Sequence, residues 1–168
     1  MGQLPLMKGV CKIMQLNKDG LKEIQHIEFG QGFKSASFGA SPVDGQQIAI
    51  GDFDGHLYLH DLEKNTTAWK VKAHSKMVNS IDAIGGMNCG YGAPEIVTGS
   101  RDGCVRLWDP RQNAPVLSLE PEEDEKGVVP DCWAVGFGNS FNSTERSIIA
   151  GYDNGDMKLF DLKQNSLV

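Results

Sequence analysis

Apolar and polar residues alternate through three similar stretches of the chain, and a pair of glycines interrupts the alternation in each stretch. An apolar run ends in Gly, a second Gly follows four residues later, and an Asp follows six residues after that. The copies are IAIGDFDGHLYLHDL (48–62), IVTGSRDGCVRLWDP (96–110) and IIAGYDNGDMKLFDL (148–162). Period-two alternation is typical of β-strands, and Asp, Asn and Gly between strands are typical of tight turns. Each copy therefore predicts a β-hairpin.

The second strand of each copy carries apolar side chains on both of its faces. In the middle copy Val105 and Leu107 point to one side, whereas Arg106 and Trp108 point to the other. The other copies repeat these positions with Leu57 and Leu59, with Met157 and Leu159, and with His60 and Phe160 at the position of Trp108. A strand with apolar groups on both faces needs a neighbouring sheet on each side. We therefore expect the hairpins to stack face to face.

The copies recur at a nearly constant distance along the chain. The second follows the first by 48 residues and the third follows the second by 52, and a partial copy, GVCKIMQL (9–16), precedes them. Repeats of about 40–50 residues with this strand pattern are typical of β-propeller blades. We therefore predict an all-β fold with about three and a half four-stranded blades in one partial propeller (1–168). Its parts are a half-blade (1–29), two blades (30–72 and 73–120) and a blade that lacks most of its outer strand (121–168).

The alternation also predicts where the individual strands lie. The expected strands cover 9–16, 21–29, 33–38, 46–51, 56–61, 68–72, 77–84, 95–100, 104–109, 116–120, 132–137, 147–151 and 156–161. The outer strand of the last blade is expected only to begin at Val168.

The middle copy resembles a WD repeat. Its phrase GSRDGCVRLWDP (99–110) follows an upstream Ala-His pair (73–74). In that family a polar tetrad ties each blade together, and the resemblance assigns this tetrad to His74, Thr98, Asp102 and Trp108. The neighbouring copies depart from the pattern, because the first has His60 in place of Trp and the third has Phe160. Their assignment as blades rests on the strand and turn pattern.

Longer phrases resemble one family of WD-repeat proteins, the Monad-type family. These phrases are GAPEIVTGSRDG (92–103), LWDPRQ (107–112), DCWAVGFGN (131–139) and AGYDNGDMKLFDL (150–162). The resemblance implies a seven-bladed ring, which this chain would enter inside the first blade and leave inside the fourth, as an N-terminal-half fragment. It also implies a cochaperone-associated role in the cytoplasmic assembly of axonemal dynein arms. The implied partners are cochaperone components and dynein-assembly clients.

Composition and charge argue against several other classes of function. A net charge of −6 and a pI of about 5.1 argue against a nucleic-acid surface, because phosphate binding requires clustered Lys and Arg. The sequence contains no apolar run long enough to span a membrane and no signal-peptide pattern at its start. We therefore expect a cytoplasmic protein with reduced cysteines.

The residue types that carry chemistry do not occur in convincing constellations. Asp52, Asp54 and Glu63 imitate the spacing of a calcium loop, but Leu57 stands where such a loop requires Gly. The four histidines and four cysteines lack zinc-ligand spacing. A structural, hydrogen-bonding role for His74 is favoured over that of a catalytic base. The sequence thus predicts no catalytic residue, metal or cofactor.

The remaining hypothesis is a non-catalytic scaffold that binds proteins through loops beside the innermost strands. Aromatic residues and Arg dominate binding hot spots, which makes Phe53, Arg101, Tyr152 and Trp133 the candidate anchors. Two alternatives stay open. One is a truncated WD-repeat product without an independent function, and the other is a propeller enzyme whose acidic turns hold a metal or a sugar.

The incomplete ring predicts unsatisfied surfaces at its two ends. Cys11 and Ile13 in the opening half-blade, and Met157 and Leu159 in the last blade, are expected to lose part of their apolar cover. Exposed apolar surface of this kind drives association. We therefore expect the chain to self-associate or to need further blades for stability.

Overall fold

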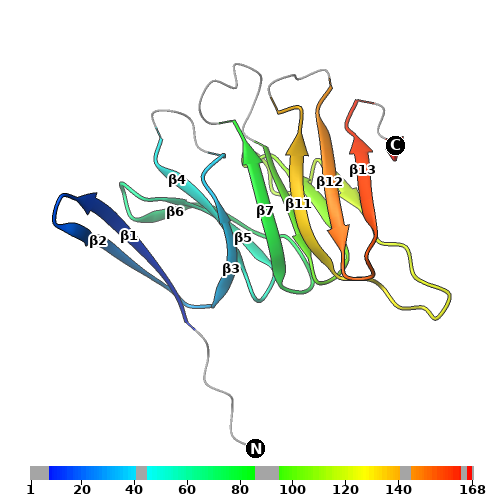
Figure 1. Ribbon diagram of the computed structural model, residues 1–168, viewed down its shortest axis with the longest axis horizontal. Helices are drawn as coiled ribbons and strands as arrows, with labels where there is room; N and C mark the ends of the chain where they lie inside the picture. The colour runs from blue at the N-terminus through cyan, green and yellow to red at the C-terminus, as the bar shows by residue number, and fades with distance from the viewer. Residues whose placement is uncertain (1–7, 41–44, 86–94, 141–144, 164–165, 168) are drawn as a thin grey trace, which may run out of the picture.

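The computed structural model describes residues 8–40, 45–85, 95–140, 145–163 and 166–167, and every regular element in this part of the chain is a β-strand (Figure 1). The strands form four antiparallel sheets. Sheet 1 contains β1 (Gly9–Asn17) and β2 (Gly20–Phe29). Sheet 2 contains β3 (Phe33–Ser37), β4 (Gln47–Asp52), β5 (His56–Asp61) and β6 (Thr66–Lys72). In the described residues no helix is long and apolar enough to cross a membrane.

The other two sheets repeat the arrangement of sheet 2. Sheet 3 contains β7 (Val78–Ile84), β8 (Glu95–Ser100), β9 (Val105–Trp108) and β10 (Leu117–Leu119). Sheet 4 contains β11 (Cys132–Gly138), β12 (Ser147–Tyr152), β13 (Met157–Asp161) and β14 (Ser166–Leu167). Within each sheet, every strand pairs with the next one along the chain. The first strands of the three four-stranded sheets, β3, β7 and β11, lie side by side (Figure 1). The predicted all-β fold of stacked, four-stranded units is therefore confirmed.

The observed strand ends differ little from the predicted ones. β6 begins at Thr66, two residues earlier than expected, and β10 is shorter than expected. The outer strand of sheet 4 already pairs at Ser166 and Leu167, ahead of the expected start at Val168, which lies outside the described residues.

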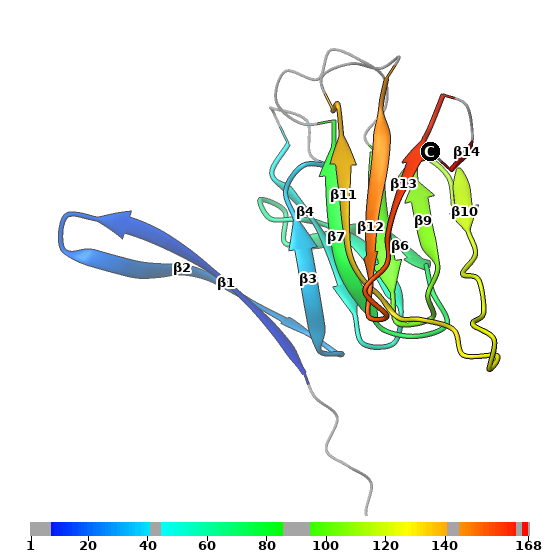
Figure 2. The same ribbon diagram turned by 45° about the vertical axis from the view of Figure 1, so that its right-hand side comes forward.

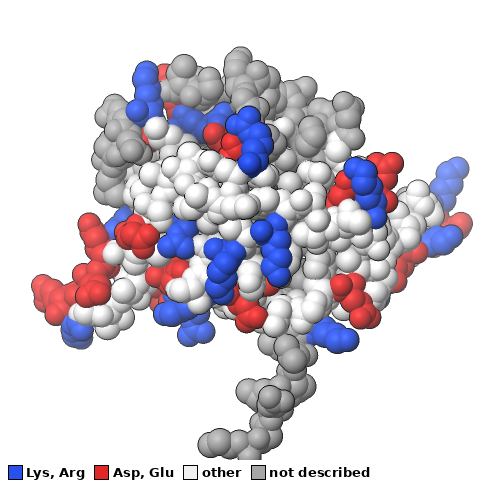
Figure 3. Space-filling view, turned by 180° about the vertical axis from the view of Figure 1, so that it is seen from behind, with Lys and Arg blue, Asp and Glu red and all other residues white. Residues whose placement is uncertain are grey.

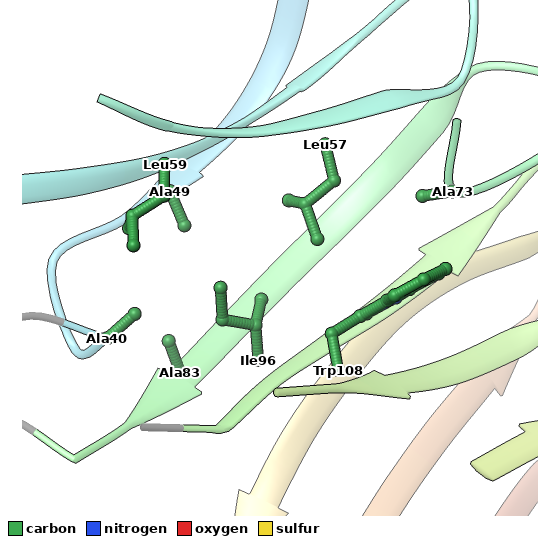
Figure 4. Packing of buried hydrophobic residues seen from close by; sticks show 8 residues of the cluster. All are labelled: Ala40, Ala49, Leu57, Leu59, Ala73, Ala83, Ile96 and Trp108. Atoms are coloured by element: carbon green, nitrogen blue, oxygen red, sulfur yellow. The ribbon is translucent and has the colours of Figure 1, made fainter. Parts of the chain in front are cut away.

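Three apolar clusters fill the spaces between successive sheets. Sheets 1 and 2 enclose the first, which includes Ile27, Ile48 and Ile50. Sheets 2 and 3 enclose the second, where Leu57 and Leu59 meet Ile96 and Trp108 (Figure 4). The third cluster lies between sheets 3 and 4 and contains the following residues: Val97, Val105, Leu107, Cys132, Ile148, Ala150, Tyr152 and Phe160. As the alternation predicted, sheets 2 and 3 each pack both of their faces, one against the preceding sheet and one against the following sheet.

The first glycine of each copy marks the place where the next sheet approaches. A Cβ on Gly51 would lie 2.5 Å from Val78 Cγ1 of β7, and a Cβ on Gly99 would lie 2.7 Å from Cys132 Sγ of β11. A side chain at either position would push the innermost strand of the following sheet away. At Gly151, the third equivalent position, the nearest atom is Ala134 Cβ at 3.8 Å. Sheet 4 therefore has the same close-packing surface as sheets 2 and 3, and it is open.

The open face of sheet 4 is apolar. Met157 is 73% exposed, and Ile149 and Leu159 are each 40% exposed. The same face forms an open apolar hollow of about 420 Å³ with Gly151 and Met157 in its lining. The expectation that Met157 and Leu159 lose their cover is confirmed.

At the other end of the stack, the most exposed apolar side chains are not those of the two residues named in the prediction. Cys11 and Ile13 are partly buried against the cluster between sheets 1 and 2. The exposed apolar residues of β1 are instead Val10, Met14 and Leu16. Because the sheets stack in one direction, sheet 1 and sheet 4 leave opposite faces of their strands uncovered. The prediction had assumed that the same face is uncovered in both sheets. The β1–β2 hairpin extends away from the main body (Figure 2).

Candidate functional site

The four predicted tetrad residues lie in one hydrogen-bonded series in sheet 3. Trp108 in β9 donates its indole N–H to Thr98 Oγ1 in β8 at 2.9 Å. Thr98 Oγ1 lies 2.7 Å from Nε2 of His74, which precedes β7. Nδ1 of His74 lies 3.1 Å from Oδ1 of Asp102 in the turn between β8 and β9. The series thus joins two strands, the turn between them and the segment that enters the sheet.

The hydrogen-bond partners of His74 determine which of its ring nitrogens carries the proton. Asp102 is a carboxylate, so His74 donates from Nδ1, and Nε2 is left to accept the proton of Thr98. Burial lowers the pKa of His74 below its ordinary value, against the opposing effect of Asp102. Burial alone would raise the pKa of Asp102, but hydrogen bonds from His74 and from the backbone N–H of Ser75 hold it well below its usual range. His74 is therefore neutral and Asp102 charged near neutral pH.

The tetrad is closed to solutes. Thr98 is 0% exposed, His74 is 1% exposed and Trp108 is 2% exposed. A group that no substrate can touch acts on the fold, so the geometry supports a structural role for this series.

Sheet 2 contains a different network, which the sequence analysis missed. Oδ1 of Asp52 accepts the backbone N–H groups of Asp54 at 2.9 Å and His56 at 2.7 Å. Oδ2 accepts the Tyr58 hydroxyl at 2.7 Å and lies 3.1 Å from His56 Nδ1. Asp52 is 2% exposed. Its carboxylate ties the β4–β5 turn to the following strand. The available signal was the alternation of His56 and Tyr58, which places both side chains on one face of β5.

The turns between the second and third strands of sheets 2, 3 and 4 form a common rim, at the lower edge of Figure 1. In each turn, the second residue after the first glycine donates its backbone N–H to the segment before the innermost strand. The three donors are Phe53, Arg101 and Asp153, and their acceptors are the carbonyl groups of Gly32, Met77 and Asp131. Phe53 and Arg101, two of the predicted anchors, therefore hold equivalent positions in neighbouring sheets.

A hollow of about 440 Å³ lies between these two anchors. Phe53, Lys76, Met77 and Arg101 line it. The Arg101 side chain is 61% exposed, and its Nε lies 3.2 Å from Oδ2 of Asp131. The hollow thus combines two apolar side chains with two cations at the rim.

Tyr152 does not lie on this surface, which corrects the prediction that it is a rim anchor. Tyr152 pairs with Cys132 of β11, is 9% exposed, and packs in the cluster between sheets 3 and 4. It comes one residue before the rim position, and successive residues of a strand point to opposite faces. Asp153 holds the equivalent rim position, and its Oδ1 accepts the backbone N–H of Asp131 at 3.0 Å.

Trp133, the fourth predicted anchor, lies at an irregularity of the innermost strand. The register shifts between Cys132 and Ala134, between Val78 and Ser80, and between Phe33 and Ser35. The residues at these three shifts are Trp133, Asn79 and Lys34. A bulge re-aims the side chain of the extra residue. Trp133 is 61% exposed as a result.

Lys34 links the three bulges across three sheets. Lys34 Nζ donates to Asn79 Oδ1 at 3.1 Å and lies 5.5 Å from the centre of the Trp133 ring. Asn79 Nδ2 donates to the Cys132 carbonyl at 2.9 Å. Lys34 and Asn79 were not predicted from the sequence, because they lie 17 and 20 residues before the first glycine of their copies, whereas Trp133 lies 18 residues before its own.

Acidic groups gather elsewhere. Glu122, Glu123, Asp124 and Glu125 are exposed on the loop between β10 and β11, which projects from the body (Figure 3). Within the described part of the chain, no group of three or more His, Cys, Asp or Glu side chains could hold a metal ion.

Comparison with known proteins defines the class. The family profile "WD40: WD domain, G-beta repeat" matches residues 65–109. Among solved structures, the chain is similar to the β-propeller domain of Cps50 (Swd1) from Myceliophteria thermophila. The TM-score is 0.61 and the identity 19%, over 81% of this chain and 36% of that one. With the stacked sheets described above, these matches show a β-propeller fold that contains a WD repeat at residues 65–109.

The particular resemblance is to dynein axonemal assembly factor 10. The Homo sapiens protein is 45% identical over 169 residues, which cover 99% of this chain and 47% of that protein. The Chlamydomonas reinhardtii protein is 45% identical over 161 residues, which cover 95% of this chain and 44% of that protein. The chain therefore spans about half the length of the curated relatives that it matches. The resemblance found in the sequence motifs is confirmed.

Proposed function

We propose that this chain is a non-catalytic scaffold that acts in the cytoplasm in the assembly of axonemal dynein arms, together with cochaperone components. The observation that carries the proposal is the 45% identity to dynein axonemal assembly factor 10 over 99% of the chain. The relatives are named as dynein axonemal assembly factors, and nearly all of this chain aligns with them.

The rim supports the binding part of the proposal. It presents Phe53, Arg101 and Trp133 on turns and bulges held by backbone hydrogen bonds. Rigid elements that display an aromatic side chain and an Arg are favourable for protein recognition, because little conformational freedom is lost on binding. The tetrad and the Asp52 network lie directly beneath these turns and fix their shape.

The test is capture of axonemal dynein heavy chains from cells that build motile cilia, with the tagged chain as bait. Arg101→Glu and Trp133→Ala should each weaken capture and leave the melting temperature nearly unchanged, since both side chains are exposed. Lys18→Glu, in the exposed turn between β1 and β2, is the control. Capture by both rim variants at the level of the unaltered chain would place the binding surface elsewhere. Failure of the unaltered chain to capture any dynein or cochaperone component would contradict the proposed function itself.

A further inference from the structure

The three bulges form one surface that crosses sheets 2, 3 and 4. Lys34, Asn79 and Trp133 occupy the same position in their respective sheets, and Lys34 contacts both of the others. Bulges are recurrent means of aiming a side chain out of the ladder, and three at one level place their side chains in a row. Asn79 is 7% exposed and holds Lys34 from below, so the ammonium group and the indole form the accessible part of the row.

The hollow continues this row. Arg101 Nε pairs with Asp131, which immediately precedes β11 and so lies within two residues of Trp133. Phe53 donates its backbone N–H to the carbonyl of Gly32, two residues before Lys34. The row and the hollow are therefore parts of a single surface, which we call the bulge-row surface: Lys34, Phe53, Lys76, Met77, Arg101 and Trp133.

The charges of this surface are unevenly compensated. Within the described residues, neither Lys34 nor Lys76 has a carboxylate within 4.0 Å, and Lys34 is held by a neutral amide. Two neighbouring carboxylates are already engaged, Asp131 by Arg101 and Asp153 by the backbone N–H of Asp131. In a chain of net charge −6, the bulge-row surface is thus a place where positive charge remains unpaired.

We propose that the bulge-row surface binds an extended acidic segment of a partner protein that carries one aliphatic or aromatic anchor residue. Carboxylates of the segment pair with Lys34 and Lys76, and the anchor enters the hollow between Phe53 and Met77. The exposed Trp133 ring covers the segment on one side. This inference rests on the proposed scaffold function and names the chemistry of the partner. The carboxylates of Asp131 and Asp153 disfavour a continuous phosphate backbone, whereas a peptide can alternate charged and neutral groups.

Fluorescence anisotropy of a labelled peptide tests the proposal with the whole chain. The probe is an acetylated peptide of about ten residues, alternating Asp and Ser around a central Leu, long enough when extended to cross neighbouring sheets. The matched probe replaces each Asp with Asn. We expect the acidic probe to bind, the Asn probe to bind at least about tenfold more weakly, and binding of the acidic probe to weaken as salt is added.

The variants separate this inference from the proposed function. Lys34→Glu combined with Lys76→Glu should weaken the acidic probe about tenfold, whereas Lys18→Glu, with a smaller but same-sign change in net charge away from the surface, should change it less than about twofold. Met77→Ser should weaken both probes. Equal binding of the acidic and Asn probes, or no binding of either, would overturn the acidic-segment proposal. Tighter binding of a single-stranded oligonucleotide of similar length would also overturn it. If dynein capture still depends on Arg101 and Trp133 in those cases, the scaffold function stands without it.

Discussion

Thr98 is the residue on which the tetrad depends, because its hydroxyl accepts from Trp108 and donates to His74. An unpaired buried polar group costs about 1–3 kcal/mol. We therefore expect Trp108→Phe and His74→Ala each to lower the free energy of unfolding by about 1–3 kcal/mol in urea titrations. Loss of either partner changes the free energy that the remaining hydrogen bond to Thr98 contributes. The two losses of stability should therefore not be additive.

The double variant measures this coupling. We expect the two losses to differ from their sum by at least about 0.5 kcal/mol. A pair of distant surface substitutions, Lys18→Glu with Lys126→Glu, should by contrast be additive. Additive losses for Trp108→Phe and His74→Ala would mean that the hydrogen-bonded series is not a coupled network.

Acidification should weaken the fold through His74. Burial lowers its pKa in the folded chain, so below its ordinary pKa of about 6.5 the unfolded chain binds a proton that the folded chain does not. The stability that this group contributes is present above that pH and is lost as the pH falls. The lowered pKa of Asp102 acts in the same direction below about pH 4.

The measurement is the free energy of unfolding at several pH values between about 7.5 and 5.5, in the unaltered chain and in His74→Gln. Glutamine does not titrate, so its variant should lose less stability on acidification, although it starts from a lower value. Identical pH dependence in the two proteins would show that His74 accepts a proton without cost.

At this scale, prediction from sequence succeeded where a family pattern specified the partners. The tetrad residues were named from one WD-like phrase, and the structure brings all four together. The Asp52 network has no such pattern, because it replaces the tetrad with a carboxylate and neighbours on the next strand. Tyr152 was misplaced because composition alone marks it as an anchor, and only its register with Cys132 shows that it points inward.

The turn glycines belong to the scale of the elements. Gly55 and Gly155 hold equivalent positions in sheets 2 and 4, with φ of +83° and +91°. A Cβ on Gly55 would overlap the carbonyl oxygens of His74 and Lys76, which lead into sheet 3, whereas a Cβ on Gly155 meets nothing within 4 Å. Substitution by Ala therefore introduces backbone strain alone at Gly155, but both strain and a steric clash at Gly55.

Ala at Gly155 should cost about 1–2 kcal/mol of stability, the usual cost of the left-handed conformation. Ala at Gly55 should cost roughly 1–3 kcal/mol more, because the entry to sheet 3 must shift. Urea titrations of the two variants give the difference directly. Equal losses at the two turns would show that the segment before β7 moves aside freely.

The hairpins were predictable because period-two alternation and Gly-containing turns are local signals. The bulges were not, because the extra residue of an innermost strand is defined only by its pairing with the neighbouring strand. Its effect is visible only in the pairing, where Lys34, Asn79 and Trp133 fall between paired neighbours. The surface that we assign to partner binding thus arises from a feature of the elements that the residue types alone do not reveal.

At the scale of the whole molecule, the stack of sheets is directional. Each four-stranded sheet receives the preceding sheet on one face and offers a glycine-lined face to the next. The repeat spacing predicted the stack, but the uncovered faces at its two ends depend on this direction. That is why Met157 and Leu159 are exposed as expected, while Cys11 and Ile13 remain partly buried.

The open face of sheet 4 leads to the final prediction. Ile149, Met157 and Leu159 are exposed around Gly151, on the face that closely packs another sheet in sheets 2 and 3. Water contact with this apolar surface is unfavourable, and burying it against a second copy removes that cost. We therefore expect the chain in isolation to self-associate, with an apparent mass that rises with protein concentration in size-exclusion chromatography with light scattering.

Ile149→Thr combined with Met157→Lys should shift the population towards the monomer, because the double substitution makes the open face of sheet 4 polar. Val128→Ser, which removes an exposed apolar side chain from the acidic loop, should leave the association unchanged. A monomer with a cooperative thermal transition at all concentrations would show that three four-stranded sheets and a hairpin are sufficient, and that the open face of sheet 4 tolerates water.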